Sequence, residues 1–298
     1  MNRQLSQLVY AAALSSGLFL AACSGEGSDV NQGAASAVVG VNPGINGAAV
    51  VAAPDASLQV AIDALRERRL SAFLEAAMPP SQMDEMRAAW NEAKSTEIDP
   101  KEDAQMIAFM SMATAEGAED TLFMMLKPYL KDMQDQAEGM AQMLPFMVGG
   151  ALNEAGAPEE AQAMLGDFSQ KIIDIDFVSE EKARRAVGIF VTAARALKIK
   201  SGKDLQVLSF DEVMDRADIA YAGVVDILGV YGLSPDAMMK SIRVETVSTS
   251  GDIAEMKLTF SLFGKEQESV PFQMERIDGR WFPKAPEKSA QVDDGLAR

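Results

Sequence analysis

Three kinds of side chain in this sequence could do chemistry: carboxylates, methionine sulfurs and one thiol. The 298 residues include 44 Asp and Glu, 19 Met and a single Cys, but no His. His is the residue that most often serves as base, nucleophile activator or metal ligand near neutral pH. Its absence argues against Ser-His-Asp and Cys-His nucleophiles, zinc-water hydrolysis and His-ligated haem.

The methionines concentrate in one region, since twelve of the nineteen lie between Met78 and Met147. One helical stripe in that region contains Met133, Ala137, Met140, Leu144 and Met147. We predict that the stripe packs into a core, because the flexible Met side chain fills irregular gaps. Two alternatives remain open: an adaptable surface for apolar partners or acyl chains, and a thioether site for Cu(I).

Two groups of carboxylates are candidate sites. Asp226 is the only charge in an otherwise apolar or small stretch, where burial would raise its pKa; we expect it at the exposed edge of its helix or bonded to backbone. The second group, Asp174, Asp176, Glu180 and Glu181, could bind a hard cation. It lacks the Gly-punctuated loop of a calcium site, so a solvated acidic corner is preferred. We nominate no catalytic, cofactor-binding or metal-binding residue.

The overall composition excludes further classes. A hydrophobic fraction of 48% with 24% charged residues is typical of a folded globular protein. A formal net charge of −17 argues against nucleic acid and anionic lipid headgroups as partners, because both require a basic face. The length suits one large domain or two small ones.

The N-terminus has the pattern of a secretory signal. One basic residue, Arg3, precedes a short apolar run that ends in Leu20-Ala21-Ala22-Cys23. This ending resembles the lipobox of bacterial lipoproteins, in which a Leu and two small residues precede the Cys that receives the lipid. The resemblance implies cleavage before Cys23 and attachment of a diacylglycerol thioether, with fatty acyl chains such as palmitate, to that thiol.

The same resemblance implies an address. In bacterial lipoproteins an Asp after the Cys favours retention in the inner membrane, and here that position is Ser24. For a Gram-negative source this implies the periplasmic face of the outer membrane, with the inner membrane as the alternative.

The chain divides by composition into five segments. Residues 1–22 form the signal peptide, and residues 23–57 form a flexible tether without Lys, Arg or aromatic residues. Residues 58–232 have a helical period, and residues 286–298 form a polar tail. Between them, residues 233–285 are predicted to form the β meander, after a short helical turn that starts at Ser234-Pro235.

Capping residues mark several helix starts in the helical region. They are Pro80, Asp99 with Pro100, Ser179, and Ser209 with Glu212 as a capping box. Pro128 and Pro145 are expected to kink or divide a long helical stretch over 120–152. The helix after Ser209 is predicted to bury one side, made of Val213, Ala217, Tyr221, Val224, Leu228 and Tyr231.

Alternation of apolar and polar residues marks about four strands after Ser241. In the clearest one Ala254, Met256, Leu258, Phe260 and Leu262 alternate with polar residues, so the apolar set should face a helical layer. The turn pairs Gly264-Lys265 and Asp278-Gly279 separate neighbouring strands. We therefore predict an α+β fold: a mostly helical N-terminal and central part, and a C-terminal antiparallel β meander packed on helices.

The stretch from Gly251-Asp252-Ile253-Ala254 to Asp278-Gly279-Arg280-Trp281 also resembles the terminal strands of NTF2-like (cystatin-like) envelope proteins. Enzymes of that superfamily use pocket His and Asp residues. Their catalytic residues cannot be carried over to a chain without His.

Taken together, these features lead us to expect a non-enzymatic, lipid-anchored envelope protein that binds a protein partner or an apolar ligand, without a cofactor. The alternative is a hydrolase of envelope polymers that uses Asp and Glu alone. Two inward carboxyl groups about 5–10 Å apart in a cleft would favour that alternative.

Overall fold

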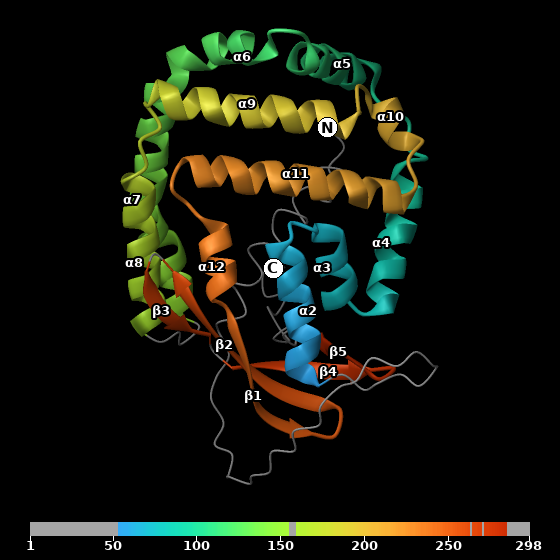
Figure 1. The fold of residues 1–298 in the computed structure, drawn as a ribbon, viewed down its shortest axis with the longest axis vertical. Coiled ribbons are helices and arrows are strands. Elements are labelled where there is room, and N and C mark those ends of the chain that lie inside the picture. Colours follow the sequence, from blue (N-terminus) through green and yellow to red (C-terminus); the bar gives the residue numbers. More distant parts are fainter. Residues whose placement is uncertain (1–52, 155–158, 263, 270, 285–298) are drawn as a thin grey trace, which may run out of the picture.

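The apolar residues change from a helical to an alternating period near Ser241, and the fold changes from helices to strands at the same point (Figure 1). The computed structural model describes residues 53–154, 159–262, 264–269 and 271–284. It confirms the α+β class, because a mostly helical part is followed by an antiparallel sheet packed against helices. The predicted signal peptide, tether and polar tail lie outside the described residues, apart from the last residues of the tether.

The first described helices are α2 (Pro54–Arg66), α3 (Leu70–Ala77) and α4 (Pro80–Ala93). α2 begins inside the predicted tether, with Pro54 at its first position. α2 and α3 are separated by Arg68, whose φ of 60° is left-handed and interrupts the helical path. Pro80 opens α4, as predicted.

Five helical elements then follow: α5 (Pro100–Thr114), α6 (Ala118–Leu126), the 3-10 turn η1 (Lys127–Tyr129), α7 (Leu130–Glu154) and α8 (Glu159–Ile173). The Asp99 side chain caps α5 by accepting a hydrogen bond from the Lys101 amide. The two prolines differ in effect. Pro128 lies in η1 and separates α6 from α7, whereas α7 continues through Pro145.

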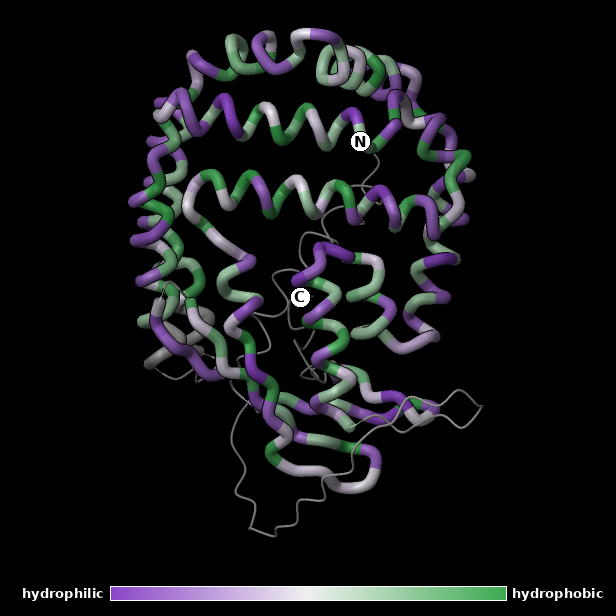
Figure 2. The backbone as a smooth tube through the Cα atoms, in the orientation of Figure 1, coloured by the Kyte–Doolittle hydropathy of each residue, from purple (hydrophilic) through white to green (hydrophobic). Residues whose placement is uncertain are grey.

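The remaining helices are α9 (Glu180–Leu197), α10 (Gly202–Gln206), α11 (Phe210–Val230) and α12 (Pro235–Ser241). Ser179 caps α9 and Ser209 with Glu212 forms the predicted box on α11. α9 lies between α11 on one side and α5 and α6 on the other (Figure 1). Hydrophilic and hydrophobic residues alternate along both α9 and α11 (Figure 2).

The predicted buried side of α11 is only partly covered. Val224 is exposed and the other five predicted residues are half-buried, whereas the buried side chains of α11 are Phe210, Val225 and Val230. α11 contacts α9, α3, α4 and α12, so its buried surface is set by several neighbours rather than by a single stripe. At Gly223 α9 packs tightly against α11, since an added Cβ would lie 3.0 Å from the Cβ of Ala193.

The sheet has strands β1 (Arg243–Ser250), β2 (Ile253–Leu262), β3 (Lys265–Glu268), β4 (Phe272–Ile277) and β5 (Arg280–Pro283). Its order is β1-β2-β4-β5, and β3 pairs with the end of β2. The β4–β5 hairpin turns at Asp278 and Gly279, which both have positive φ, as a two-residue primed turn requires. β3 is additional to the predicted four strands, because its residues are all polar.

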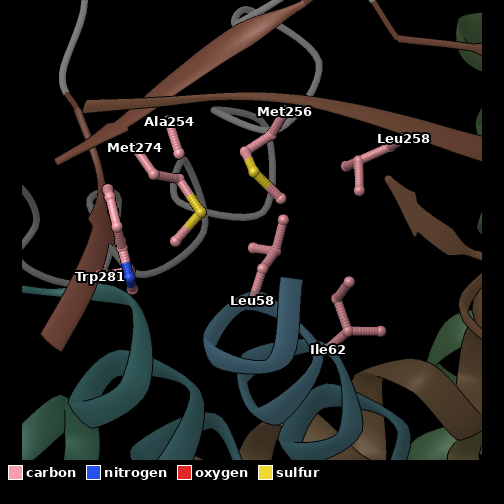
Figure 3. Packing of buried hydrophobic residues seen from close by; sticks show 7 residues of the cluster. All are labelled: Leu58, Ile62, Ala254, Met256, Leu258, Met274 and Trp281. Atoms are coloured by element: carbon pink, nitrogen blue, oxygen red, sulfur yellow. The ribbon is translucent and has the colours of Figure 1, made fainter. Parts of the chain in front are cut away.

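α2 covers one face of the sheet and forms a core cluster with it (Figure 3). The members are Leu58, Ile62, Ala254, Met256, Leu258, Met274 and Trp281. Ala254, Met256 and Leu258 are buried as the alternation in β2 predicts, while Phe260 is half-buried. The cluster joins α2, the first described helix, to strands β2, β4 and β5. Burial of each large apolar side chain in it contributes about 1.5–3 kcal/mol to the free energy of unfolding.

Candidate functional site

Four methionines of α7 lie on one side of the helix and are exposed; we call them the methionine face. The exposed fractions are 37% for Met133, 71% for Met140, 57% for Met143 and 69% for Met147. The prediction of core packing is therefore wrong for these residues. Phe146 is 85% exposed and extends the apolar surface beyond Met143, three positions earlier on the helix.

The methionine face is uncovered because α7 uses its other side for packing. Leu130, at the start of α7, is buried against Phe123 of α6 and Ala183 of α9. Farther along, Ala141 is fully buried and α7 packs mainly against α8. None of the buried clusters among the described residues includes a methionine of the face.

The core interpretation holds for other methionines of the Met-rich region. Met110 is buried with Ala113 and Ala194, and Met106 packs against the same cluster. Met83 and Met86 of α4 pack against the cluster formed by α2 and α3. The region therefore combines core residues with an exposed face. The Cu(I) alternative stays a prediction.

Charges near the methionine face are predominantly negative. Both lysines of η1 and α7 are already paired: Lys127 Nζ lies 2.7 Å from Glu180 Oε1, and Lys131 Nζ lies 3.1 Å from Asp135 Oδ1. Asp132, next to Met133, is exposed and makes no ion pair within the described part of the chain. A ligand on this face would therefore meet the exposed carboxylate of Asp132 at its margin.

Asp226 serves as one arm of an ion-pair bridge. Arg68 donates hydrogen bonds to Asp226 at 2.5 Å and to Asp236 at 2.8 Å, and so ties α11 and α12 to the link between α2 and α3. The hydrogen bonds to Asp236 and Asp226 raise the pKa of the Arg68 guanidinium. Asp226 is half-exposed, which agrees with its predicted position at the edge of the helix. Because its carboxylate is paired with Arg68, its role in this structure is to hold α11 in place.

The acidic residues before α9 do not converge on one point. Asp176 accepts a hydrogen bond from the Ser179 amide, Asp174 accepts one from Gln170, and Glu180 pairs with Lys127. Among the residues that the structure describes, no group of three or more His, Cys, Asp and Glu could hold a metal ion. Asp174, Asp176 and Glu180 are exposed, as a solvated acidic corner requires.

A depression of about 450 Å³ lies where α5 and the end of α9 meet, lined by Thr114, Ala194, Arg195, Lys198, Ile199 and Lys200. Two of its polar side chains have other partners. The Thr114 hydroxyl donates to the Met110 carbonyl, and Arg195 binds Glu119 and the Ala115 carbonyl. The lining includes no Asp or Glu, so the opposed carboxylates of the hydrolase hypothesis are not found there.

Cys23 and the lipobox lie outside the described residues, so lipid attachment stays a prediction. Over the ranges that the structure does describe, no single helix has the length and apolar character needed to cross a membrane. α11 and α12 meet both criteria only as a pair, with a bend of 102° between them.

Sequence reasoning named the methionine stripe but placed it in the core. The stripe leaves out Phe146 and Asp132, although Phe146 is the most exposed large apolar residue among those the structure describes. The sequence does carry a signal for an exposed apolar surface. Leu130 and Ala141 already give α7 one apolar side for packing, and the methionines form a second one. Comparison with protein-family models, curated proteins and solved structures gave no match.

Proposed function

We propose that this chain is a non-enzymatic, lipid-anchored envelope protein that binds a protein partner through the methionine face. The observation that carries the proposal is the exposure of Met140, Met143 and Met147 on one side of α7. Met is enriched at adaptable binding surfaces, because its unbranched, polarizable side chain fits several partner shapes. The lipid anchor is supported by Leu20-Ala21-Ala22-Cys23 in the sequence.

The shape of this surface supports a protein partner over a small apolar ligand. Sites for small molecules are concave and bury most of the ligand surface. The methionine face lies along the outside of one helix, and the depression near Thr114 is lined by other residues. A long partner segment could cover four side chains along α7, whereas a small ligand would stay largely in water.

Site-specific photocrosslinking in the native envelope tests the proposal. A photoreactive residue replaces Met140, which is exposed on the methionine face. The matched control places the same residue at Gln142, which is also exposed but lies on a different side of α7. We expect a protein adduct from position 140 and little or none from position 142, because only position 140 would lie in the interface.

Two results would overturn the proposal. Equal adducts at positions 140 and 142 would mean that proteins collide with α7 without using the methionine face. Turnover of peptidoglycan or glycan substrates by the purified chain would replace the binding function with the hydrolase alternative.

A further inference from the structure

The apolar residues of α7 repeat with the spacing of a helix–helix seam. Met133, Ala137, Met140, Leu144 and Met147 are separated by four, three, four and three positions. This average of 3.5 residues keeps one line of side chains turned toward a second helix, where each inserts between four residues of that helix. The seam is about 21 Å long, or about four helical turns.

This seam has no partner helix within the described residues. Ala137 and Leu144 are half-buried, whereas Met133, Met140 and Met147 are exposed on the same line. α8 packs along α7 and leaves these three methionines exposed. The spacing therefore indicates an additional helix as the occupant.

The charges beside the seam indicate the character of that helix. Residues 130–149 of α7 carry three acids, Asp132, Asp135 and Glu138, and one cation, Lys131. Lys131 is paired with Asp135, and Asp132 at the N-terminal end of the seam is exposed without an ion pair among the described residues. The acids of α6, Glu119 and Asp120, are paired with Arg195 and Arg184 of α9 and add no free charge here. A helix with Lys or Arg beside its apolar side would complement these groups.

We infer that the methionine face takes a basic amphipathic helix of a partner protein, an inference that rests on the proposed function. Charge disfavours the other occupants. A second copy of this chain, with its formal charge of −17, would bring the same acidic groups together. An anionic membrane surface would repel them as well.

The inference is tested with the purified chain and labelled synthetic helices of about five turns. One peptide carries Leu at the seam positions and Lys on its flanks. A second replaces each Lys with Glu, and a third is a scrambled form of the first. Binding is measured by fluorescence anisotropy at about 0.05 M and about 0.5 M salt.

We expect the Lys peptide alone to bind, and to bind more weakly at high salt, since screening reduces attraction between exposed charges. The variants Met140→Gln and Met147→Gln should each weaken binding about tenfold, equal to about 1.4 kcal/mol. Because both side chains are exposed, the variants should keep the circular dichroism spectrum of the parent. Met124→Gln is the matched control, an exposed methionine on α6 outside the face, and should bind as the parent does.

Several outcomes would overturn the inference. One is binding of the Glu peptide as tight as that of the Lys peptide, and another is Lys-peptide binding that both Met→Gln variants leave unchanged. A dimer in sedimentation velocity that Met140→Gln abolishes would identify a second copy as the occupant. Cosedimentation with phosphatidylcholine vesicles that depends on Met140 would identify a lipid surface.

Failure of the inference can be separated from failure of the proposed function. An adduct at position 140 in the envelope, without Lys-peptide binding, keeps the protein-partner function and discards the basic helix. Equal adducts at positions 140 and 142 discard the function itself.

Discussion

Replacing Met256 with Ala should show how much of the stability lies between α2 and the sheet. Met256 is fully buried in the centre of β2, and its cluster includes Leu58 and Ile62 of α2 and Met274 of β4. Loss of the buried side chain removes about 1.5–3 kcal/mol of transfer free energy. Because a helix and two strands fix the surrounding side chains, a residual cavity of about 50 Å³ would add about 1.2 kcal/mol.

We therefore expect the free energy of unfolding of Met256→Ala to fall by about 3–4 kcal/mol. Val60→Ala is the matched control: it also shortens an apolar side chain, and it lies on α2, but Val60 is exposed. The control should stay within about 0.5 kcal/mol of the parent.

Urea denaturation provides the measurement, followed by circular dichroism and by tryptophan fluorescence, which comes from Trp281 of this cluster and from Trp90 of α4. Similar losses for the two variants would refute the reasoning, because they would mean that α2 does not cover the sheet at Met256. A half-sized loss for Phe260→Ala would agree with its half-buried position.

Three further predictions concern other parts of the chain. Cys23→Ser should abolish labelling by radioactive palmitate and shift the chain out of the detergent phase, or leave it as uncleaved precursor; retention in membranes after a high-salt wash and signal cleavage would contradict this. Arg68→Ala should lower the free energy of unfolding by about 1 kcal/mol, because it removes the cation that pairs with the partly exposed Asp226 and Asp236. The loss should be smaller at high salt, which urea denaturation at two salt concentrations would show. Burial raises the pKa of Tyr221, so its contribution to stability is present below about pH 10 and is lost as the pH rises further; Tyr221→Phe should flatten that alkaline loss in thermal melts.

Features that depend on neighbours in the chain could be predicted from the sequence. The capping box of Ser209 and Glu212 needs contacts over three residues, so its residue types are sufficient to identify it. The same is true of Asp99 before α5 and of the alternation in β2, which gives the buried set Ala254, Met256 and Leu258.

Features that depend on distant partners could not be predicted. A helical stripe of Met and Leu has the same spacing whether another element covers it or not, so the pattern predicts Met140 in the core although it is exposed. The partner of Asp226 is Arg68, 158 positions earlier, and no local pattern connects them. β3 consists of polar residues, so no apolar alternation marks it in the sequence. Backbone pairing with β2 and the ion pair of Lys257 with Glu268 hold it in place.

The cluster shared by α2 and the sheet has a consequence for folding kinetics. Leu58 contacts strands that lie about 200 positions later in the chain, which is a long loop to close. α2 leaves the ribosome first, and its apolar side stays without its native cover until β2, β4 and β5 have been made. The sheet also stays uncovered on one face until α2 returns to it. A chain truncated before β4 should therefore expose both apolar surfaces together and be a ready substrate for chaperones and proteases.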